Sequence, residues 1–431
     1  MKFFGSSGIR GVVNRWLTPE LALRIGTAVG REYEKVIIGR DTRQSGYMVT
    51  ASLTAGITAQ GGDVSYAGIL PTPTLAYAAQ DHDCGIMVTA SHNPAPYNGV
   101  KMWNTDGSAF DTKQMLDIEK HIEDPPNSPD WSEVGVVSRE YNALKKHIDS
   151  IVHRFDDDYS LKVVVDCACG AAYEATPNLL RKMGCDVITL NATPDGTFPA
   201  HPPEPTEKNL RELKGMVKAS GADLGIGHDG DGDRMVGFHK NGTFLGGDKL
   251  LALFAGTRPE KVAVPINSSM VIEDIAEEVI RTKVGDVYVA EALKAHGGSF
   301  GGEPSGTWMF PEISFAPDAI YAAAVLVDLA QNKDLNKLLD SISEYPRRRE
   351  AFSVNDKETS MERLRGIYKD RYRPERIKTT DGVWLDHDRG WSLLRASGTE
   401  PKIRITAEAK DQKRLNDIYE EAKTLLKKVM I

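Results

Sequence analysis

The sequence lacks several features that mark whole classes of protein. Four cysteines in 431 residues are too few for a disulfide framework and fit a reducing compartment. No run of about 18 apolar residues occurs, so a membrane-spanning helix is not expected. The first residues also lack the apolar core of a secretory signal. We therefore expect a cytoplasmic location and no membrane partner.

An excess of positive charge is also missing. The chain has 53 Lys and Arg against 61 Asp and Glu, a net charge of −8. This balance argues against nucleic acid as a partner, but it allows an anionic small molecule in a cleft that concentrates the basic groups. The composition, 41% hydrophobic and 26% charged, is typical of a globular protein. The length exceeds what one core serves, and about three or four domains are expected.

Strand and helix signals alternate in three successive rounds along the first 345 residues. This alternation favours α/β domains with mostly parallel, mixed sheets covered by helices, and the repetition indicates three related domains. The predicted strands include 36–39, 64–67, 84–88, 161–166, 187–190, 222–226, 261–265 and 287–289. The predicted helices include 47–60, 139–155, 176–183, 206–219, 270–280 and 317–331.

The pattern changes after residues 345–349, which we interpret as a linker. Short apolar segments at 383–385, 391–394 and 403–405 predict antiparallel strands, and a final amphipathic helix is expected to pack on their sheet. This predicts a smaller C-terminal α+β domain. The expected domains are 1–150, 151–250, 251–345 and 350–431.

A serine follows one of the predicted strands directly. Residues 89–94 read Thr-Ala-Ser-His-Asn-Pro, so Ser91 lies at the carboxyl end of strand 84–88, where open α/β sheets bind ligands. A serine hydroxyl is a weak nucleophile that needs a base, a metal or prior phosphorylation. Taken alone, the segment is equally consistent with an ordinary turn at a strand end.

Three carboxylates alternate with glycines in a second loop, at Asp229, Asp231 and Asp233. They can converge on one cation, and oxygen ligands suit Mg²⁺, Mn²⁺ or Ca²⁺ rather than zinc. An EF-hand is excluded because its sixth and twelfth positions would be Arg234 and Lys240 instead of glycine and glutamate. Arg234 beside the metal would complement a phosphoryl group. The alternative is an acidic, solvated turn.

Two further loops carry polar groups suited to a phosphosugar. Residues 395–404 offer two arginines, two hydroxyls and small residues with open backbone N–H groups, the makeup of a phosphate-binding nest or of a hydrophilic hairpin turn. Residues 302–306 place Glu303 and Ser305 in one tight turn, where they could hydrogen-bond neighbouring sugar hydroxyls.

Three more side chains are candidates for the chemistry around Ser91. Arg10, in a glycine-rich segment, could hold a phosphate or brace the Ser91 loop. Lys101 is a candidate general acid or base if desolvation lowers its pKa. His92 either orients the loop or transfers protons.

These loops together resemble the α-D-phosphohexomutase family. The shared segments are 89–94, 229–234, 302–306 and 395–401, in the family's order and spacing, and residues 5–11 and 195–199 also look like that family. The resemblance covers essentially the whole chain. It implies four domains around one central cleft.

The resemblance also implies the roles of individual residues. Ser91 would work as a phosphoserine and, with the three aspartates, hold one Mg²⁺ per chain, while Glu303 and Ser305 would bind the sugar. The catalytic set is expected to be Ser91, His92, Lys101 and Arg10, with Arg234 contacting the transferring phosphate. The group expected to hold the non-reacting phosphate is Arg395, Ser397, Gly398, Thr399 and Arg404.

One position departs from the family pattern. The family's sugar loop often ends in histidine, whereas this chain has Thr307 followed by Trp308. If that histidine transfers protons in other members of the family, this role is unfilled in the present chain or passes to His92 or Lys101. The whole segment 301–308 looks most like archaeal-type phosphoglucosamine mutases, and phosphomannomutase/phosphoglucomutase members are close.

The implied reaction moves a phosphoryl group between the 6- and 1-positions of a hexose through a phosphoserine and a sugar 1,6-bisphosphate, which also serves as activator. The substrate would be a small phosphosugar, most readily glucosamine phosphate, and the enzyme a monomer or homodimer. A metal-dependent sugar phosphatase and a non-catalytic phosphosugar-binding protein are the alternatives.

Overall fold

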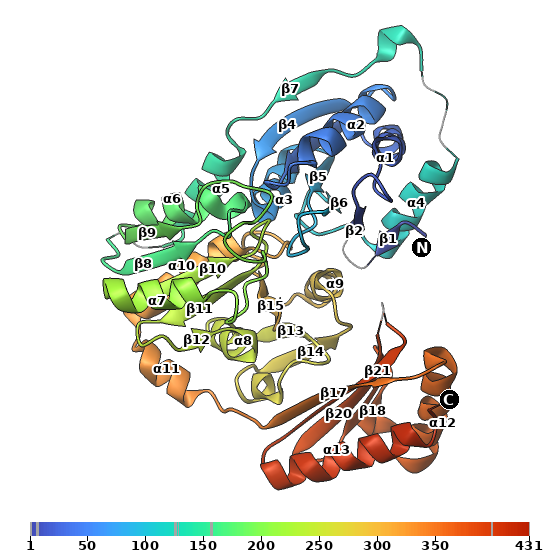
Figure 1. Ribbon diagram of the computed structural model, residues 1–431, viewed down its shortest axis with the longest axis vertical. Coiled ribbons are helices and arrows are strands. Elements are labelled where there is room, and N and C mark those ends of the chain that lie inside the picture. The colour runs from blue at the N-terminus through green and yellow to red at the C-terminus, as the bar shows by residue number, and fades with distance from the viewer. Residues whose placement is uncertain are drawn as a thin grey trace.

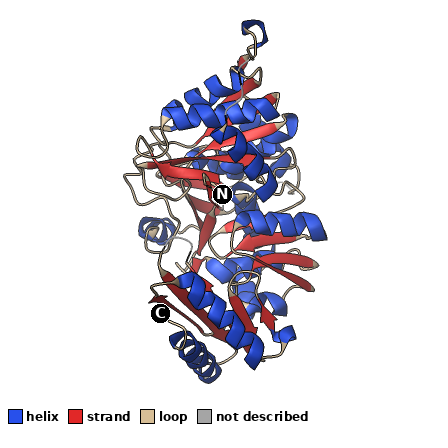
Figure 2. Cartoon of the chain, turned by 90° about the vertical axis from the view of Figure 1, so that its right-hand side faces the viewer, coloured by secondary structure: helices blue, strands red, loops and turns tan. Residues whose placement is uncertain are grey.

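The computed structural model describes residues 2–5, 8–124, 127, 129–155, 158–397 and 400–430. In this part of the chain the strands form four sheets, arranged as successive units along an arc (Figure 1). Helices cover the sheets of the first three units, as the view in Figure 2 shows. No helix in the described ranges is both long enough and apolar enough to cross a membrane.

The first unit contains the mixed sheet ordered β1-β2-β6-β5-β3-β4-β7. Its helix α1 begins after Thr18, whose hydroxyl accepts a hydrogen bond from the Leu21 N–H at 3.2 Å, and Pro19 occupies the first helical position. The strands are β1 (Phe4–Gly5), β2 (Gly8–Val12), β3 (Lys35–Arg40), β4 (Asp63–Ile69), β5 (Cys84–Val88), β6 (Tyr97–Trp103) and β7 (Val137–Arg139). The helices are α1 (Pro19–Glu32), α2 (Gly46–Thr58), α3 (Thr72–Ala78) and α4 (Thr112–Glu123).

The second and third units repeat the core of this topology. Strand orders β4-β3-β5-β6, β9-β8-β10-β11 and β14-β13-β15-β16 are equivalent: three parallel strands followed by one antiparallel strand. The second unit has α5 (Ala143–Val152), β8 (Lys162–Asp166), α6 (Ala175–Lys182), β9 (Asp186–Leu190), α7 (Arg211–Ser220), β10 (Leu224–His228), β11 (Met235–His239) and β12 (Phe244–Leu245). The third has α8 (Gly247–Ala255), β13 (Lys261–Pro265), β14 (Glu278–Thr282), α9 (Asp286–His296), β15 (Phe300–Glu303), β16 (Thr307–Met309), α10 (Ala319–Asn332) and α11 (Leu335–Ser341).

The fourth unit is an antiparallel sheet, ordered β17-β21-β20-β19-β18, with α13 packed against one face (Figure 1). Its elements are β17 (Arg347–Ser353), α12 (Lys357–Arg371), β18 (Ile377–Lys378), β19 (Val383–Asp386), β20 (Gly390–Ala396), β21 (Lys402–Ala409) and α13 (Gln412–Lys427). The expected fold class, three related α/β domains followed by a smaller α+β domain, is confirmed.

Several predicted elements are wrong in the details. Segment 270–280 is not a helix: a 3₁₀ turn, η4 (Met270–Asp274), is followed by β14, which pairs in parallel with β13. Segment 287–289 is not a strand but lies in α9. The predicted helix 139–155 is shorter, because residues 137–139 pair with β4, and most of the predicted linker 345–349 belongs to β17.

Candidate active site

One cavity of about 860 Å³ is lined by residues of all four units. The loops that enter it follow equivalent strands: β5 precedes the Ser91 loop, β10 the aspartate loop and β15 the sugar loop. The predicted site residues that line it are Arg10, Ser91, His92, Lys101, Asp233, Arg234, Glu303, Ser305 and Arg395. Asp229 and Asp231 lie beside them, Ser397 and Arg404 are outside the lining, and Gly398 and Thr399 fall outside the described residues.

Ser91 adopts a backbone conformation that is rare for a residue with a side chain. Its φ of 50° lies in the left-handed region, where non-glycine residues are strained. The Ser91 N–H donates to the Thr89 hydroxyl at 2.8 Å, and the Ser91 hydroxyl donates to Oδ2 of Asp229 at 2.8 Å. This turn therefore directs a buried hydroxyl at the aspartate loop.

A buried arginine from another segment holds this turn in place. The guanidinium of Arg43 is fully buried and stacks on the ring of Phe198, with its carbon 5.0 Å from the ring centroid. Each of its N–H donors has a partner, so the charge is fully satisfied. The acceptors, at 2.7 to 3.0 Å, are Oδ2 of Asp41 and the carbonyl oxygens of Ser91, Asn93, Pro94 and Tyr97.

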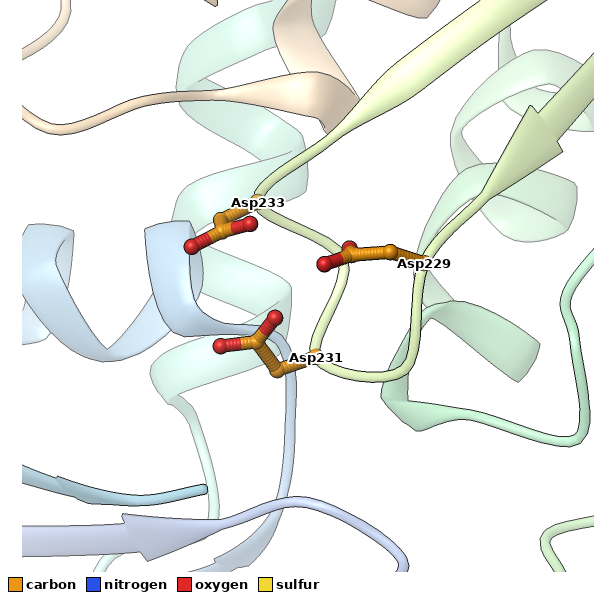
Figure 3. A group of neighbouring side chains, drawn as sticks. All are labelled: Asp229, Asp231 and Asp233. Atoms are coloured by element: carbon orange, nitrogen blue, oxygen red, sulfur yellow. The ribbon is translucent and has the colours of Figure 1, made fainter. Parts of the chain in front are cut away.

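The three aspartates converge as their spacing predicted. Carboxylate oxygens of Asp229, Asp231 and Asp233 all lie within 4.8 Å of one another, and Figure 3 shows the three side chains directed into a common space. All three are buried, and Oδ1 of Asp231 and Oδ1 of Asp233 have no hydrogen-bond partner among the described residues. Buried oxygens of this kind fit a divalent cation such as Mg²⁺. Burial and the neighbouring carboxylates raise the pKa of Asp229, a repulsion that a cation would relieve.

Lys101 contacts the same carboxylates. Its ammonium donates to Oδ2 of Asp233 at 2.7 Å and to Oδ2 of Asp231 at 3.2 Å. Burial alone would lower the pKa of Lys101, but the two carboxylates outweigh it and raise the pKa above its usual value. The carboxylates therefore oppose the shift that general acid–base catalysis by Lys101 would need, and this role of Lys101 stays a prediction.

Two arginines and a histidine complete the wall near Ser91. Arg10 reaches Oδ1 of Asn93 at 3.4 Å, and the backbone N–H of Arg234 donates to Oδ1 of Asp229 at 3.1 Å. Nδ1 of His92 lies 3.2 Å from the Ser91 hydroxyl. Burial, together with the positive charges of Arg234 and Arg10, lowers the pKa of His92 to about 3, so its imidazole is neutral at pH 7.

The sugar loop is a hairpin tied to the aspartate loop. The Met235 N–H donates to the Gly306 carbonyl at 3.0 Å, and the indole N–H of Trp308 donates to the Met235 carbonyl at 2.8 Å. Glu303 accepts from the Gly285 N–H at 2.9 Å, and burial with the nearby charge of Asp286 raises the pKa of Glu303 to about 7. Thr307, at the position of the family's histidine, donates to Glu303 at 3.4 Å.

The fourth unit closes the cavity from the opposite side. Nε of Arg395 lies 2.8 Å from Oδ2 of Asp381, which also accepts from the Val284 N–H of the third unit at 3.1 Å. Arg404 instead pairs with Glu400 at 3.3 Å. Of the described residues predicted to bind the second phosphate, Arg395 is thus the one presented to the cavity.

Several residues that shape the site carry no recognisable motif in the sequence. Asp41 and Arg43 support the Ser91 turn, and the Thr72 hydroxyl donates to Oδ2 of Asp231 at 2.6 Å. Lys283 and Asp286 line the cavity. A polar Asp-Thr-Arg sequence at the carboxyl end of β3 was the available signal for the first pair, since it follows a buried strand.

The comparisons with known proteins agree with this geometry. Four domain profiles of phosphoglucomutase/phosphomannomutase match the chain in order: α/β/α domain I at residues 1–128, II at 142–242, III at 246–345 and the C-terminal domain at 351–425. The chain belongs to this family, the α-D-phosphohexomutases, and is accordingly a phosphosugar mutase, an isomerase.

Individual relatives within this family carry names that specify a substrate. The chain is 47% identical to the probable phosphoglucosamine mutase of Methanosarcina acetivorans, with 100% of both chains covered. It is 39% identical to the phosphoglucosamine mutase of Methanococcus maripaludis, over 99% of each chain. Among solved structures, it superimposes on a phosphoglucomutase/phosphomannomutase family protein of Burkholderia thailandensis with a TM-score of 0.88 at 28% identity, covering 98% of this chain and 97% of the other.

Proposed function

We propose that the protein interconverts glucosamine 6-phosphate and glucosamine 1-phosphate through a phosphoserine at Ser91. The observation that carries the proposal is a convergence at one cavity. The Ser91 hydroxyl and Arg395 line it from opposite walls, and three carboxylates that could bind a metal lie in or directly beside it. This arrangement suits a sugar with a reacting group at one end and a fixed phosphate at the other.

In the proposed reaction the phosphorus–Oγ bond of phosphoserine 91 breaks, and a bond forms to the free hydroxyl of the sugar phosphate. Asp229, Asp231, Asp233 and the Ser91 phosphoryl group would hold one Mg²⁺, which neutralises charge on the transferring group. Arg10 and Arg234 line the same cavity and would contact the phosphoryl oxygens. The hydroxyl proton would pass to His92, whose Nδ1 lies 3.2 Å from Oγ of Ser91, and from His92 to the departing Oγ, which restores the serine hydroxyl.

After the first transfer, the bisphosphate turns in the cavity and returns its other phosphoryl group to Ser91. A trace of sugar 1,6-bisphosphate would restore any lost phosphoserine, so we propose it as activator. The choice of glucosamine rests on the names of the relatives and on Glu303 and Asp286, whose carboxyl groups line the sugar region and suit a substrate with an ammonium group. A cytoplasmic location and a monomer or homodimer stay predictions.

The test is a coupled assay with Mg²⁺ and a trace of bisphosphate, comparing glucosamine 6-phosphate, glucose 1-phosphate and mannose 1-phosphate while recording released phosphate. We expect fastest turnover of the glucosamine phosphate without phosphate release. A preference for glucose or mannose phosphates would overturn the substrate, and phosphate release without isomerisation would favour the phosphatase. In a Ser91→Ala variant, full activity would exclude the phosphoserine.

A further inference from the structure

The face of the fourth sheet that borders the cavity carries Arg347 and three further arginines. On β17 and β21, Arg349 lies opposite Thr406 and Ala351 lies opposite Arg404, and Arg404 is in turn opposite Arg395 on β20. Residues that pair directly, and residues two apart on one strand, share a face of a sheet. Arg349, Arg404 and Arg395 therefore project from the same face.

This shared face is directed at the active-site cavity. Arg349 and Arg395 both line the cavity, and Leu393, on the same face, packs against Ile266 of the third unit. The alternate residues of β21, such as Ile405, lie on the opposite face within the core that contains α13. The strand register and the cavity lining are independent observations, and both indicate that Arg349 and Arg395 project toward the cavity.

Arg349 differs from the other two arginines in its partners. Arg395 pairs with Asp381, and Arg404 pairs with Glu400. The guanidinium of Arg349 makes no ion pair, hydrogen bond or ring contact with any residue that the structure describes. Partial burial and the nearby charge of Arg347 lower the pKa of Arg349 by more than the carboxylate of Asp248 raises it. The charge of Arg349 is thus incompletely compensated, and an anion beside it would be stabilised.

We propose that Arg349 binds the non-transferring phosphate of the phosphosugar, together with Arg395. A guanidinium presents paired N–H donors that match phosphate oxygens, and two arginines on one sheet face can share one dianion. This residue lies more than forty positions before the 395–404 loop. The assignment adds to the proposed function and rests on it.

The neighbouring arginine provides a matched control. Arg348 projects from the opposite face of β17, where it pairs with Glu350 and Glu420 and its guanidinium carbon lies 3.7 Å from the ring centroid of Tyr419. Arg349→Gln and Arg348→Gln remove the same charge one residue apart. Only the first change faces the cavity.

The first experiment measures KM and kcat for glucosamine 6-phosphate in both variants. Since a hydrogen bond to a charged group contributes about a factor of 10 to 100 in binding, we expect Arg349→Gln to raise KM at least about tenfold with a smaller change in kcat. Arg349→Lys should recover part of the loss, and Arg348→Gln should match the wild type. Equal KM values for Arg349→Gln and Arg348→Gln would overturn the proposal.

A second experiment separates this assignment from the proposed function. Calorimetric titration with inorganic phosphate needs no turnover, so it tests Arg349 even if the wild type isomerises no hexose phosphate. We expect Arg349→Gln to weaken phosphate binding relative to the wild type and to Arg348→Gln. Unchanged phosphate affinity would reject the role of Arg349, whereas inactivity of the wild type in the mutase assay would reject the proposed function alone.

Discussion

At the scale of single residues, the site depends on a buried arginine that is remote from any recognisable motif. Arg43 neutralises Asp41 and satisfies the carbonyl oxygens of the Ser91 turn. Removing one partner of a buried, hydrogen-bonded ion pair leaves an uncompensated charge and typically costs about 3–5 kcal/mol. We therefore expect Arg43→Met to lower the free energy of unfolding by that amount, as measured by urea denaturation.

The effect of this substitution should extend to activity. Without Arg43, the Ser91 carbonyl loses the hydrogen bond that helps to hold this residue in its strained conformation. The Ser91 hydroxyl is then less well positioned, so any folded Arg43→Met protein should turn over substrate far more slowly. Arg40→Met is the control, because Arg40 bonds Tyr66 and the Asp41 carbonyl instead of the Ser91 turn. A free energy of unfolding equal to that of the wild type in Arg43→Met would show that the buried pair contributes nothing to stability.

The raised pKa of Glu303 gives a pH-dependent prediction. Its pKa moves from 4.5 to about 7 because burial and then the charge of Asp286 disfavour the carboxylate. The folded state therefore holds this proton more tightly than the unfolded state, and the stability it contributes is fully present below pH 4.5 and is lost as pH rises through about 7.

A Glu303→Gln variant removes this titration. Because 1.36 kcal/mol corresponds to one pKa unit, the wild type should lose up to about 3 kcal/mol relative to the variant between pH 4.5 and pH 8. Urea denaturation of both proteins at pH 4.5, 6 and 8 measures the difference. A difference that does not vary with pH would contradict the raised pKa.

The residues that the sequence identified are those whose chemistry is concentrated in one short segment. The three aspartates stand two positions apart in one loop, so their convergence follows from local geometry. Arg43 reaches the Ser91 turn from 48 positions away, and Arg349 reaches the cavity from a strand that reads as a linker. Such contacts depend on strand order and register, which no local pattern contains.

At the scale of elements, the three α/β units present their loops at one repeated place. In each unit the loop follows the third parallel strand and leads into the antiparallel strand. Three loops in equivalent positions therefore reach one site, although their side chains differ. The loops meet at close range: a Cβ added at Gly230 would lie 2.8 Å from the Ser91 carbonyl oxygen. Glycine at this position lets the aspartate loop approach the serine turn.

A Gly230→Ala substitution should therefore push the two loops apart. Misplacing a reacting group by about 1 Å costs on the order of 100-fold in rate, so we expect a loss of at least tenfold in kcat in the mutase assay. Gly215→Ala is the matched control, because its Cβ would meet nothing within 4 Å on α7. Gly215→Ala should stabilise the protein by about 0.5–1 kcal/mol, because alanine favours the helix over glycine. Equal kcat values for Gly230→Ala and Gly215→Ala would contradict the close approach of the two loops.

The two mispredicted elements of the third unit show where local patterns fail. Val287 to Val289 is a β-branched and aromatic run that favours a strand, yet it forms the first turns of α9, with Val287 and Val289 buried. Segment 270–280 has helical spacing, but only its first half turns, and β14 pairs with β13 at the edge of the sheet. In both places tertiary packing overrides local propensity: one segment pairs as a parallel strand of the sheet, and the other forms a helix that covers it.

At the scale of the whole molecule, the carboxylate of Glu408 links the fourth unit to the third through several contacts. Oε2 of Glu408, on β21, accepts from the indole N–H of Trp391 at 2.9 Å and from the Met270 N–H of the third unit at 2.7 Å. Its Oε1 pairs with Arg347 at 2.7 Å, and Arg347 also pairs with Asp248 on α8 at 2.7 Å. This network holds the wall that carries Arg349 and Arg395 against the cavity.

Breaking the network should loosen the fourth unit from the other three. Glu408→Ala leaves Arg347 with one carboxylate fewer and the Trp391 and Met270 N–H groups without an acceptor, at a cost of several kcal/mol at this interface. In differential scanning calorimetry we expect a separate transition at lower temperature for the fourth unit, which has its own core around α13. Glu420→Ala, on the exposed face of α13, is the control. Because the phosphate-binding wall would then be held less firmly, KM for the phosphosugar should rise in Glu408→Ala. A single unchanged transition with wild-type KM would show that the remaining contacts, which are Arg347 with Asp248, Asp381 with the Val284 N–H and the apolar contact around Ile266, suffice to hold the unit.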